Sequence, residues 1–162
     1  MYRGAERNDM KTLTANMEMY LKTIFEIAGD GGQPRVKTIA HRLGVTMPSV
    51  SGAIENLQKK GLVEHTPYGD VRLTTKGRRV ARQVKDRNDL IYRFLLDVLK
   101  LPPATATRDA CVLEHVVSPK TLERLSSFLQ FTETHGEDVG RVIERYAEWL
   151  EQEESSVERL GS

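Results

Sequence analysis

The sequence predicts a mainly α-helical protein, in which three helices and a small β-hairpin precede a second, wholly helical part. Apolar residues recur at helical spacing in residues 13–28, 36–43 and 47–60. Two short runs suited to β-strands, residues 61–65 and 71–74, flank a turn-forming segment. Helical spacing then returns, so we expect one domain over residues 1–80 and a helical domain over residues 81–155.

The first three helices have recognisable ends. Glycines at positions 29, 31 and 32 end the helix over 13–28. Gly44-Val45-Thr46 forms a tight turn between the next two helices, and Thr46 is a plausible N-cap. Pro48 is tolerated in the first turn of the helix over 47–60. Two helices joined by a three-residue turn that contains glycine predict a helix-turn-helix.

The segment after this pair of helices predicts a β-hairpin. Residues 61–65 and 71–74 are the two strands, and Pro67-Tyr68-Gly69-Asp70 supplies the turn. Thr75-Lys76-Gly77-Arg78-Arg79 then opens another helix with basic residues beside the hairpin. This order of elements predicts a winged helix-turn-helix.

The charge distribution points to a polyanionic partner for the first half. The net charge of the chain is +1, but residues 32–96 carry 13 Lys and Arg against 5 Asp and Glu. Residues 97–162 carry 7 against 13. A basic helix-turn-helix joined to an acidic second half favours binding of double-stranded DNA over a winged helix used only for protein contacts.

The predicted DNA-contacting residues fall into two classes. The outward side of the helix over 47–60 offers small or weakly polar groups to the major groove, without an Arg or Gln for bidentate base contacts. Basic residues around it are expected to contact phosphates, so specificity should depend on DNA shape and methyl contacts. The full predicted set is Lys37, Met47, Pro48, Ser49, Ser51, Gly52, Arg72, Lys76 and Arg78.

The second half contains a candidate metal-binding motif. Helices are expected over residues 80–100 and 109–117, from Ser118 onward, and after Glu137 and Asp138. Within residues 109–117, Cys111, Glu114 and His115 share one side of the helix, and Val112, Leu113, Val116 and Val117 share the other. A thiolate, a carboxylate and an imidazole at this spacing can point at one ion. Packing with a surface ion pair is the alternative.

Met19 and His135 are two further candidate metal ligands. Met19 lies opposite the apolar stripe of its helix, beside Glu18, Lys22 and Glu26, where it is either a ligand or a single exposed hydrophobic residue. His135 lies beside Glu137 and Asp138, a pattern that favours a solvated helix start over a metal site.

The stretch from Leu13 to Phe131 resembles the diphtheria toxin repressor family of metal-dependent regulators, including its manganese-sensing branch. The matching segments are TANMEMYLKTIFEI, VKTIAHRLGVTMPSVSGAIENLQKKGLV, VRLTTKG and DACVLEHVVS. The resemblance implies a winged-helix domain, a helical metal-binding and dimerisation domain, and DNA binding activated by Fe(II) or Mn(II). It also implies that Met19, Cys111, Glu114 and His115 form the activating metal site.

The chain departs from the family pattern at several positions. Asn88, Tyr92 and Thr107 replace the ligands of the family's ancillary site, so that site is expected to be absent or rebuilt. Two sulfur ligands favour Fe(II) over Mn(II), although Co(II), Ni(II) and Zn(II) would also bind. Gly52 replaces a glutamine of the toxin repressor, so the operator sequence does not transfer. We expect no counterpart of the β-barrel third domain that longer members carry.

The sequence therefore predicts a homodimeric, cytoplasmic, Fe(II)-dependent regulator, most simply a repressor of iron-uptake genes. No signal-peptide pattern and no run of about 18 apolar residues is present, so no membrane association is expected. A regulator that responds to another divalent ion is one alternative, and a winged helix that senses a small molecule or oxidant through Cys111 is another. A thiol enzyme that uses Cys111 and His115 would lack an orienting third group, so no enzyme activity is expected.

Overall fold

The computed structural model describes residues 13–66 and 69–160, with side chains described as far as residue 153. Its contacts divide the chain between Arg87 and Asn88, inside a helix, into two compact units. Each unit has its own hydrophobic core. Within the described ranges, no helix is both long enough and apolar enough to cross a membrane.

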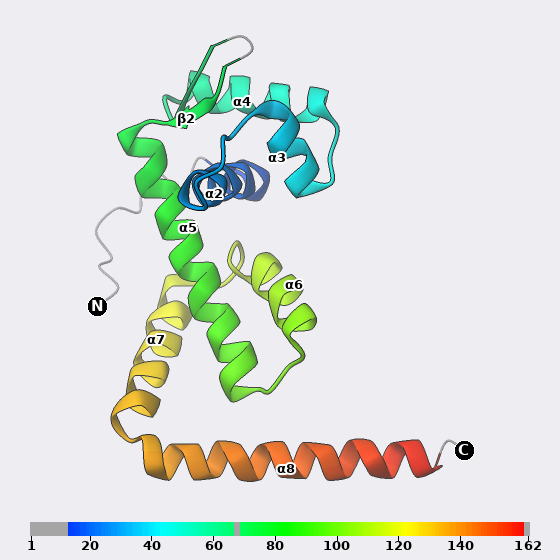
Figure 1. Ribbon diagram of the computed structural model, residues 1–162. Coiled ribbons are helices and arrows are strands. Elements are labelled where there is room, and N and C mark those ends of the chain that lie inside the picture. The colour runs from blue at the N-terminus through cyan, green and yellow to red at the C-terminus, as the bar shows by residue number, and fades with distance from the viewer. Residues whose placement is uncertain (1–12, 67–68, 161–162) are drawn as a thin grey trace. The chain divides into compact units, whose positions relative to one another are not determined.

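The first unit is a winged helix-turn-helix, as predicted (Figure 1). Its two strands pair antiparallel, with Val63 opposite Leu73 and His65 opposite Val71. Pro67 and Tyr68 of the predicted turn lie outside the described residues. In chain order the elements are α2 (Ala15–Gly29), α3 (Val36–Leu43), α4 (Met47–Lys59), β1 (Val63–His65), β2 (Val71–Leu73) and the start of α5 (Thr75–Arg93).

The helix ends follow the local sequence signals. The Thr46 side chain caps α4 by accepting a hydrogen bond from the backbone N–H of Ser49, and the Thr14 side chain caps α2 in the same way. Gly44 ends α3 with a φ of +65°, in the left-handed region that favours glycine. These caps fix the length of the helix-turn-helix.

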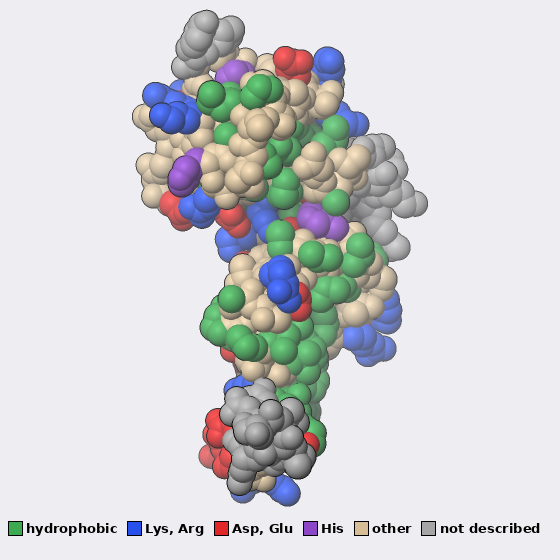
Figure 2. Space-filling model, turned by 90° about the vertical axis from the view of Figure 1, so that its right-hand side faces the viewer, with side chains coloured by type: hydrophobic (Ala, Val, Ile, Leu, Met, Phe, Trp, Pro, Cys, Tyr) green, Lys and Arg blue, Asp and Glu red, His purple; other side chains and the backbone are tan. Residues whose placement is uncertain are grey.

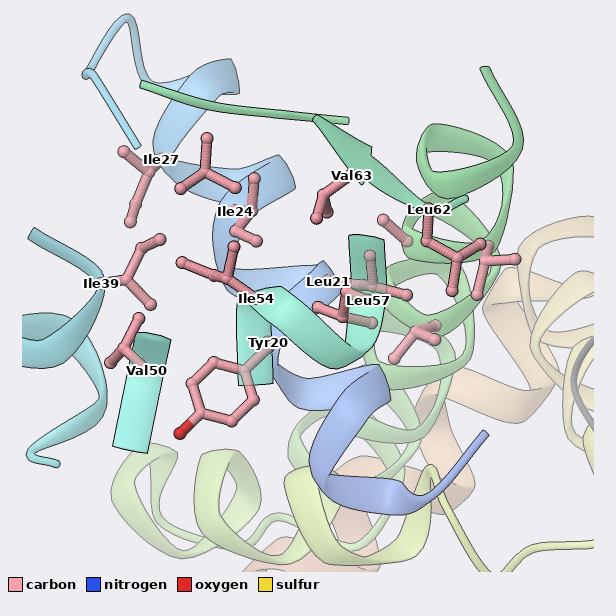
Figure 3. Close-up of a cluster of buried hydrophobic side chains, with 14 of the residues drawn as sticks. Tyr20, Leu21, Ile24, Ile27, Ile39, Val50, Ile54, Leu57, Leu62 and Val63 are labelled. Atoms are coloured by element: carbon pink, nitrogen blue, oxygen red, sulfur yellow. The ribbon is translucent and has the colours of Figure 1, made fainter. Parts of the chain in front are cut away.

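Apolar side chains from α2, α3, α4, the wing and the first half of α5 form the core of the first unit (Figure 3). Leu21 and Ile24 of α2 point toward Ile54 and Leu57 of α4, with Val63 of β1 beside them. These five side chains are 0–3% exposed. The buried side of α4 is thereby fixed, and its opposite side faces solvent.

The polar side of α2 is not a solvent-facing surface. Glu18 and Lys22 are buried, at 6% and 7% exposed. The Glu18 carboxylate lies 3.0 Å from the Arg87 guanidinium of α5, and both side chains are largely buried. Met19 is half-buried and packs against the core of this unit, so it is not the exposed residue that periodicity alone suggested. Periodicity identified the apolar stripe of α2 but could not show that α5 covers another side.

The second unit is helical throughout its described residues. Its small core contains Ile91, Leu95, Ala106, Ala110 and Leu122. After Arg93 the chain continues as a π-helical segment, so the helix predicted over 80–100 is regular only to Arg93. The elements are η1 (Phe94–Val98), α6 (Pro103–Leu113), α7 (Pro119–Thr134) and α8 (Gly136–Leu160).

The helix predicted over residues 109–117 was misplaced at both ends. It is α6, which begins at Pro103, since proline suits the first turn of a helix. It ends at Leu113, because the His115 N–H bonds to the Val112 carbonyl, three residues back, and the winding tightens. The predicted start at Ser118 is confirmed, because its side chain caps α7.

Replacing Gly77 with alanine should destabilise the protein. A Cβ atom at this position would lie 1.8 Å from the Leu62 carbonyl oxygen, so α5 and the wing would have to move apart. We expect Gly77→Ala to lower the free energy of unfolding by about 1–3 kcal/mol. The control is Gly52→Ala, where a Cβ would meet nothing within 4 Å. It should raise the unfolding free energy by about 0.5–1 kcal/mol in urea denaturation. Equal effects of the two substitutions would contradict this packing.

Breaking the buried Glu18–Arg87 pair should be costly. Arg87→Met would remove the guanidinium that lies 3.0 Å from a carboxylate that is 8% exposed. We expect a loss of about 3–5 kcal/mol in unfolding free energy. The control is Glu133→Gln, which breaks the exposed Arg93–Glu133 pair and should cost less than about 1 kcal/mol. A similar cost for both variants, measured in urea, would rule out the special role of the buried pair.

Candidate metal and DNA sites

The three motif residues of the second unit lie where α6 ends. Cys111 occupies the last turn of the helix, Glu114 is its C-cap and His115 lies in the following turn. The Glu114 N–H still bonds to the Ala110 carbonyl at 3.0 Å. The three residues therefore lie on a helix terminus and the turn after it, and not on one continuous helix face.

The burial of this segment is the reverse of what its polarity suggests. The Glu114 side chain is completely buried, at 0% exposed, whereas Val112 is 62% and Val116 is 72% exposed. A buried carboxylate is unfavourable unless hydrogen bonds or a positive charge compensate it. The two exposed valines also lose the favourable free energy that burial of their side chains would give. This inverted arrangement requires a compensating partner for Glu114.

The immediate neighbour of Glu114 is His115. Its Nε2 atom lies 3.2 Å from the Glu114 Oε1 atom, and the His115 side chain is 12% exposed. Cys111 is half-buried one turn earlier. Among the residues that the structure describes, no three His, Cys, Asp or Glu side chains are placed together so as to hold a metal ion. The structure thus pairs two of the four predicted ligands.

The donor types fit a borderline divalent metal. Cys111, Glu114 and His115 offer a thiolate, a carboxylate and an imidazole, and Met19 offers a thioether. Such a set suits Fe(II) and its neighbours in the transition series better than Mg²⁺ or Ca²⁺. Met19 belongs to the first unit and the other three residues belong to the second.

The positions of the family's ancillary site carry no comparable set of donors. Thr107 is exposed, and its hydroxyl donates a hydrogen bond to the Pro103 carbonyl within α6. Asn88 and Tyr92 are half-buried on α5. His135 stacks on Phe131 with ring centroids 4.2 Å apart, and its Nδ1 atom lies 2.9 Å from the Thr134 hydroxyl. These contacts place His135 at the junction of α7 and α8.

The predicted DNA-contacting residues are all exposed. On α4 these are Met47, Pro48, Ser49, Ser51 and Gly52, opposite the side that is buried in the core. The basic members are also exposed, and they are Lys37 on α3, Arg72 on β2, and Lys76 and Arg78 on α5. The Ser49 hydroxyl already forms a hydrogen bond with the Thr46 hydroxyl, 2.9 Å away at the start of α4.

Sequence reasoning missed one interaction that positions the wing. The Arg35 Nε atom donates to an Asp70 carboxylate oxygen at 2.9 Å, and the Val71 N–H bonds to the Pro34 carbonyl. These contacts join the segment before α3 to the end of the hairpin turn. No local signal could identify them, because the partners are about 35 residues apart in the sequence.

The chain matches two family descriptions in tandem. Residues 12–71 match "Iron dependent repressor, N-terminal DNA binding domain". Residues 74–139 match "Iron dependent repressor, metal binding and dimerisation domain". The two matches cover more than half of the chain.

Individual relatives agree with these matches. The transcriptional regulator MntR of Escherichia coli O157:H7 is 37% identical over 117 residues, which are 72% of this chain and 73% of MntR. The iron-dependent repressor IdeR of Mycobacterium leprae is 36% identical over 120 residues, 74% of this chain and 52% of IdeR. A solved structure of the manganese regulator SloR superposes with a TM-score of 0.65 at 34% identity, over 74% of this chain and 55% of SloR.

The matched region is thus about half the length of IdeR and SloR but nearly three quarters of MntR. The two domain matches, the winged helix-turn-helix and the helical second unit agree with one another. The family consists of transcriptional regulators and not of enzymes. The chain belongs to the iron-dependent repressor family of metal-dependent transcriptional regulators.

Proposed function

We propose that this protein is a homodimeric, cytoplasmic repressor that binds operator DNA when Fe(II) occupies a site made by Met19, Cys111, Glu114 and His115. The observation that carries the metal site is the inverted burial at the end of α6. There Glu114 is 0% exposed while Val112 and Val116 are largely exposed. A buried carboxylate beside an imidazole provides two ligand types that divalent transition metals accept.

Fe(II) is proposed because two of the four ligands are sulfur atoms. Thiolate and thioether ligands are softer than carboxylates, and Mn(II) prefers oxygen. The relatives include proteins named for manganese and for iron, so the family alone does not choose between them. Mn(II) is therefore the main alternative, with Co(II), Ni(II) and Zn(II) behind it.

The switch is proposed to depend on the division of the ligands between the two units. Met19 lies on α2 of the DNA-binding unit, and Cys111, Glu114 and His115 lie in the other unit. Residues that share one ion restrain the units that carry them, and that restraint would favour the spacing of recognition helices that operator DNA requires. A bound ion would place positive charge beside the Glu114 carboxylate and the Cys111 sulfur. By linkage, operator DNA must raise the affinity for the metal equally.

Substituting the proposed ligands one at a time should distinguish residues that bind the metal from residues that link metal binding to DNA binding. We expect His115→Ala to abolish metal-stimulated binding of operator DNA. Met19→Ala should keep more of the metal affinity but lose the stimulation, since it removes the ligand of the first unit. The control is His135→Ala, which removes an exposed histidine stacked on Phe131.

Fe(II) and Mn(II) titrations under reducing conditions, with fluorescence anisotropy of a labelled operator, measure these effects. The four-residue site is wrong if Met19→Ala and His115→Ala both keep the stimulation of the parent protein. A response to oxidant without any response to metal would instead support a thiol sensor based on Cys111.

DNA binding should be strongly dependent on salt, because exposed basic residues contact phosphates. Lys76→Ala or Arg78→Ala should lower affinity for all duplexes alike and reduce the slope of log affinity against log salt by about one. Ser49→Ala should instead change the discrimination between operators. Lys120→Ala, at an exposed position of α7, is the control for loss of one positive charge. Affinity independent of salt would contradict the proposed interface.

A further inference from the structure

Within residues 13–66 and 69–160, no element buries the apolar side of helix α8. It has 25 residues, about 37 Å of helix. Helix α8 follows the C-terminal end of α7 (Figure 1). Among the described elements, α7 is the one that α8 chiefly contacts. None of its side chains described between residues 136 and 153 is buried. In proteins most of the stability of a helix comes from packing of its apolar side, and α8 has little such packing within the described residues.

The apolar residues of α8 form a continuous seam. Val139, Val142, Tyr146 and Trp149 follow one another at spacings of three, four and three residues, which is the repeat by which helices pack on one another. Val142 is 66%, Tyr146 is 37% and Trp149 is 54% exposed. We call these four residues the α8 seam. An exposed seam of this length indicates a protein-binding surface.

The charge of α8 argues against lipid and nucleic acid as its partner. Residues 136–160 contain eight Asp and Glu but only three Lys and Arg. Helices that lie on anionic membranes carry Lys and Arg on their polar side. The side of α8 opposite the seam carries Glu144 and Glu148, and both are exposed. A protein surface is therefore the partner that fits.

The α8 seam begins where the metal-binding and dimerisation domain ends in the sequence. The match to the metal-binding and dimerisation domain ends at residue 139, which is the first residue of the seam. The same unit exposes Phe128 and Phe131 on α7, at 39% and 47%. Figure 2 shows hydrophobic side chains reaching the surface of this unit.

From these observations we infer that the α8 seam packs on a second copy of this chain and extends the dimer interface beyond the matched domain. The inference rests on the proposed homodimer. It assigns to the acidic C-terminal helix a role that the family match does not cover.

Sedimentation equilibrium of the full chain with matched variants tests this inference. Tyr146→Ala/Trp149→Ala removes the two aromatic rings of the seam, and Glu144→Ala/Glu148→Ala places the same number of alanines on the opposite side of the helix. We expect the seam variant to weaken dimerisation at least tenfold, since buried aromatic residues dominate interfaces. The control should stay within about twofold of the parent protein. Equal dissociation constants for the two variants overturn the inference.

Trp149 also provides a direct measurement, because it is the only tryptophan in the chain. In the dimer of the unmodified protein, acrylamide should quench its fluorescence several-fold less than it quenches a free tryptophan derivative. Quenching equal to that of the free derivative overturns the inference even if the seam variant fails to fold. A parent protein that remains monomeric with metal and operator would instead refute the proposed homodimer itself.

Discussion

The packing of α2 against α4 is the constraint on which the proposed DNA-binding surface depends. Leu21 and Ile24 meet Ile54 and Leu57 in one core, so α4 can rotate little about its own axis. The side that this core leaves free carries Met47, Ser49, Ser51 and Gly52. The small size of Ser49, Ser51 and Gly52 is compatible with a close approach to DNA. The close contact of Gly77 with Leu62 holds the wing on the same core.

Among the residues whose burial the structure describes, each unit contains one buried carboxylate, and different side chains lie beside the two. In the first unit Glu18 is paired with Arg87, a group that stays positively charged. In the second unit Glu114 lies beside His115, an imidazole that is charged only when protonated. Glu18 therefore has a permanent counter-charge within the chain.

Much of the first unit was predictable from the sequence because its signals are local. Thr46 and Gly44 act on neighbouring backbone groups, so the turn between α3 and α4 could be placed to within a residue. The two strands flank turn residues, and the charge imbalance of residues 32–96 needs no structure to be seen. The spacing of Cys111, Glu114 and His115 supplied three candidate ligands, and the family resemblance added Met19.

By itself the sequence determined the element order, the helix caps, the charge asymmetry and the membership of a regulator family. Only the tertiary structure decided which polar residues are buried. Periodicity put Glu18, Lys22 and Glu114 on polar sides, yet all three are buried, whereas Val112 and Val116 are exposed. A helical pattern reports one apolar side, but burial depends on every neighbouring element, and those neighbours come from distant parts of the chain. For the same reason the end of α6 and the uncovered seam of α8 became visible only in three dimensions.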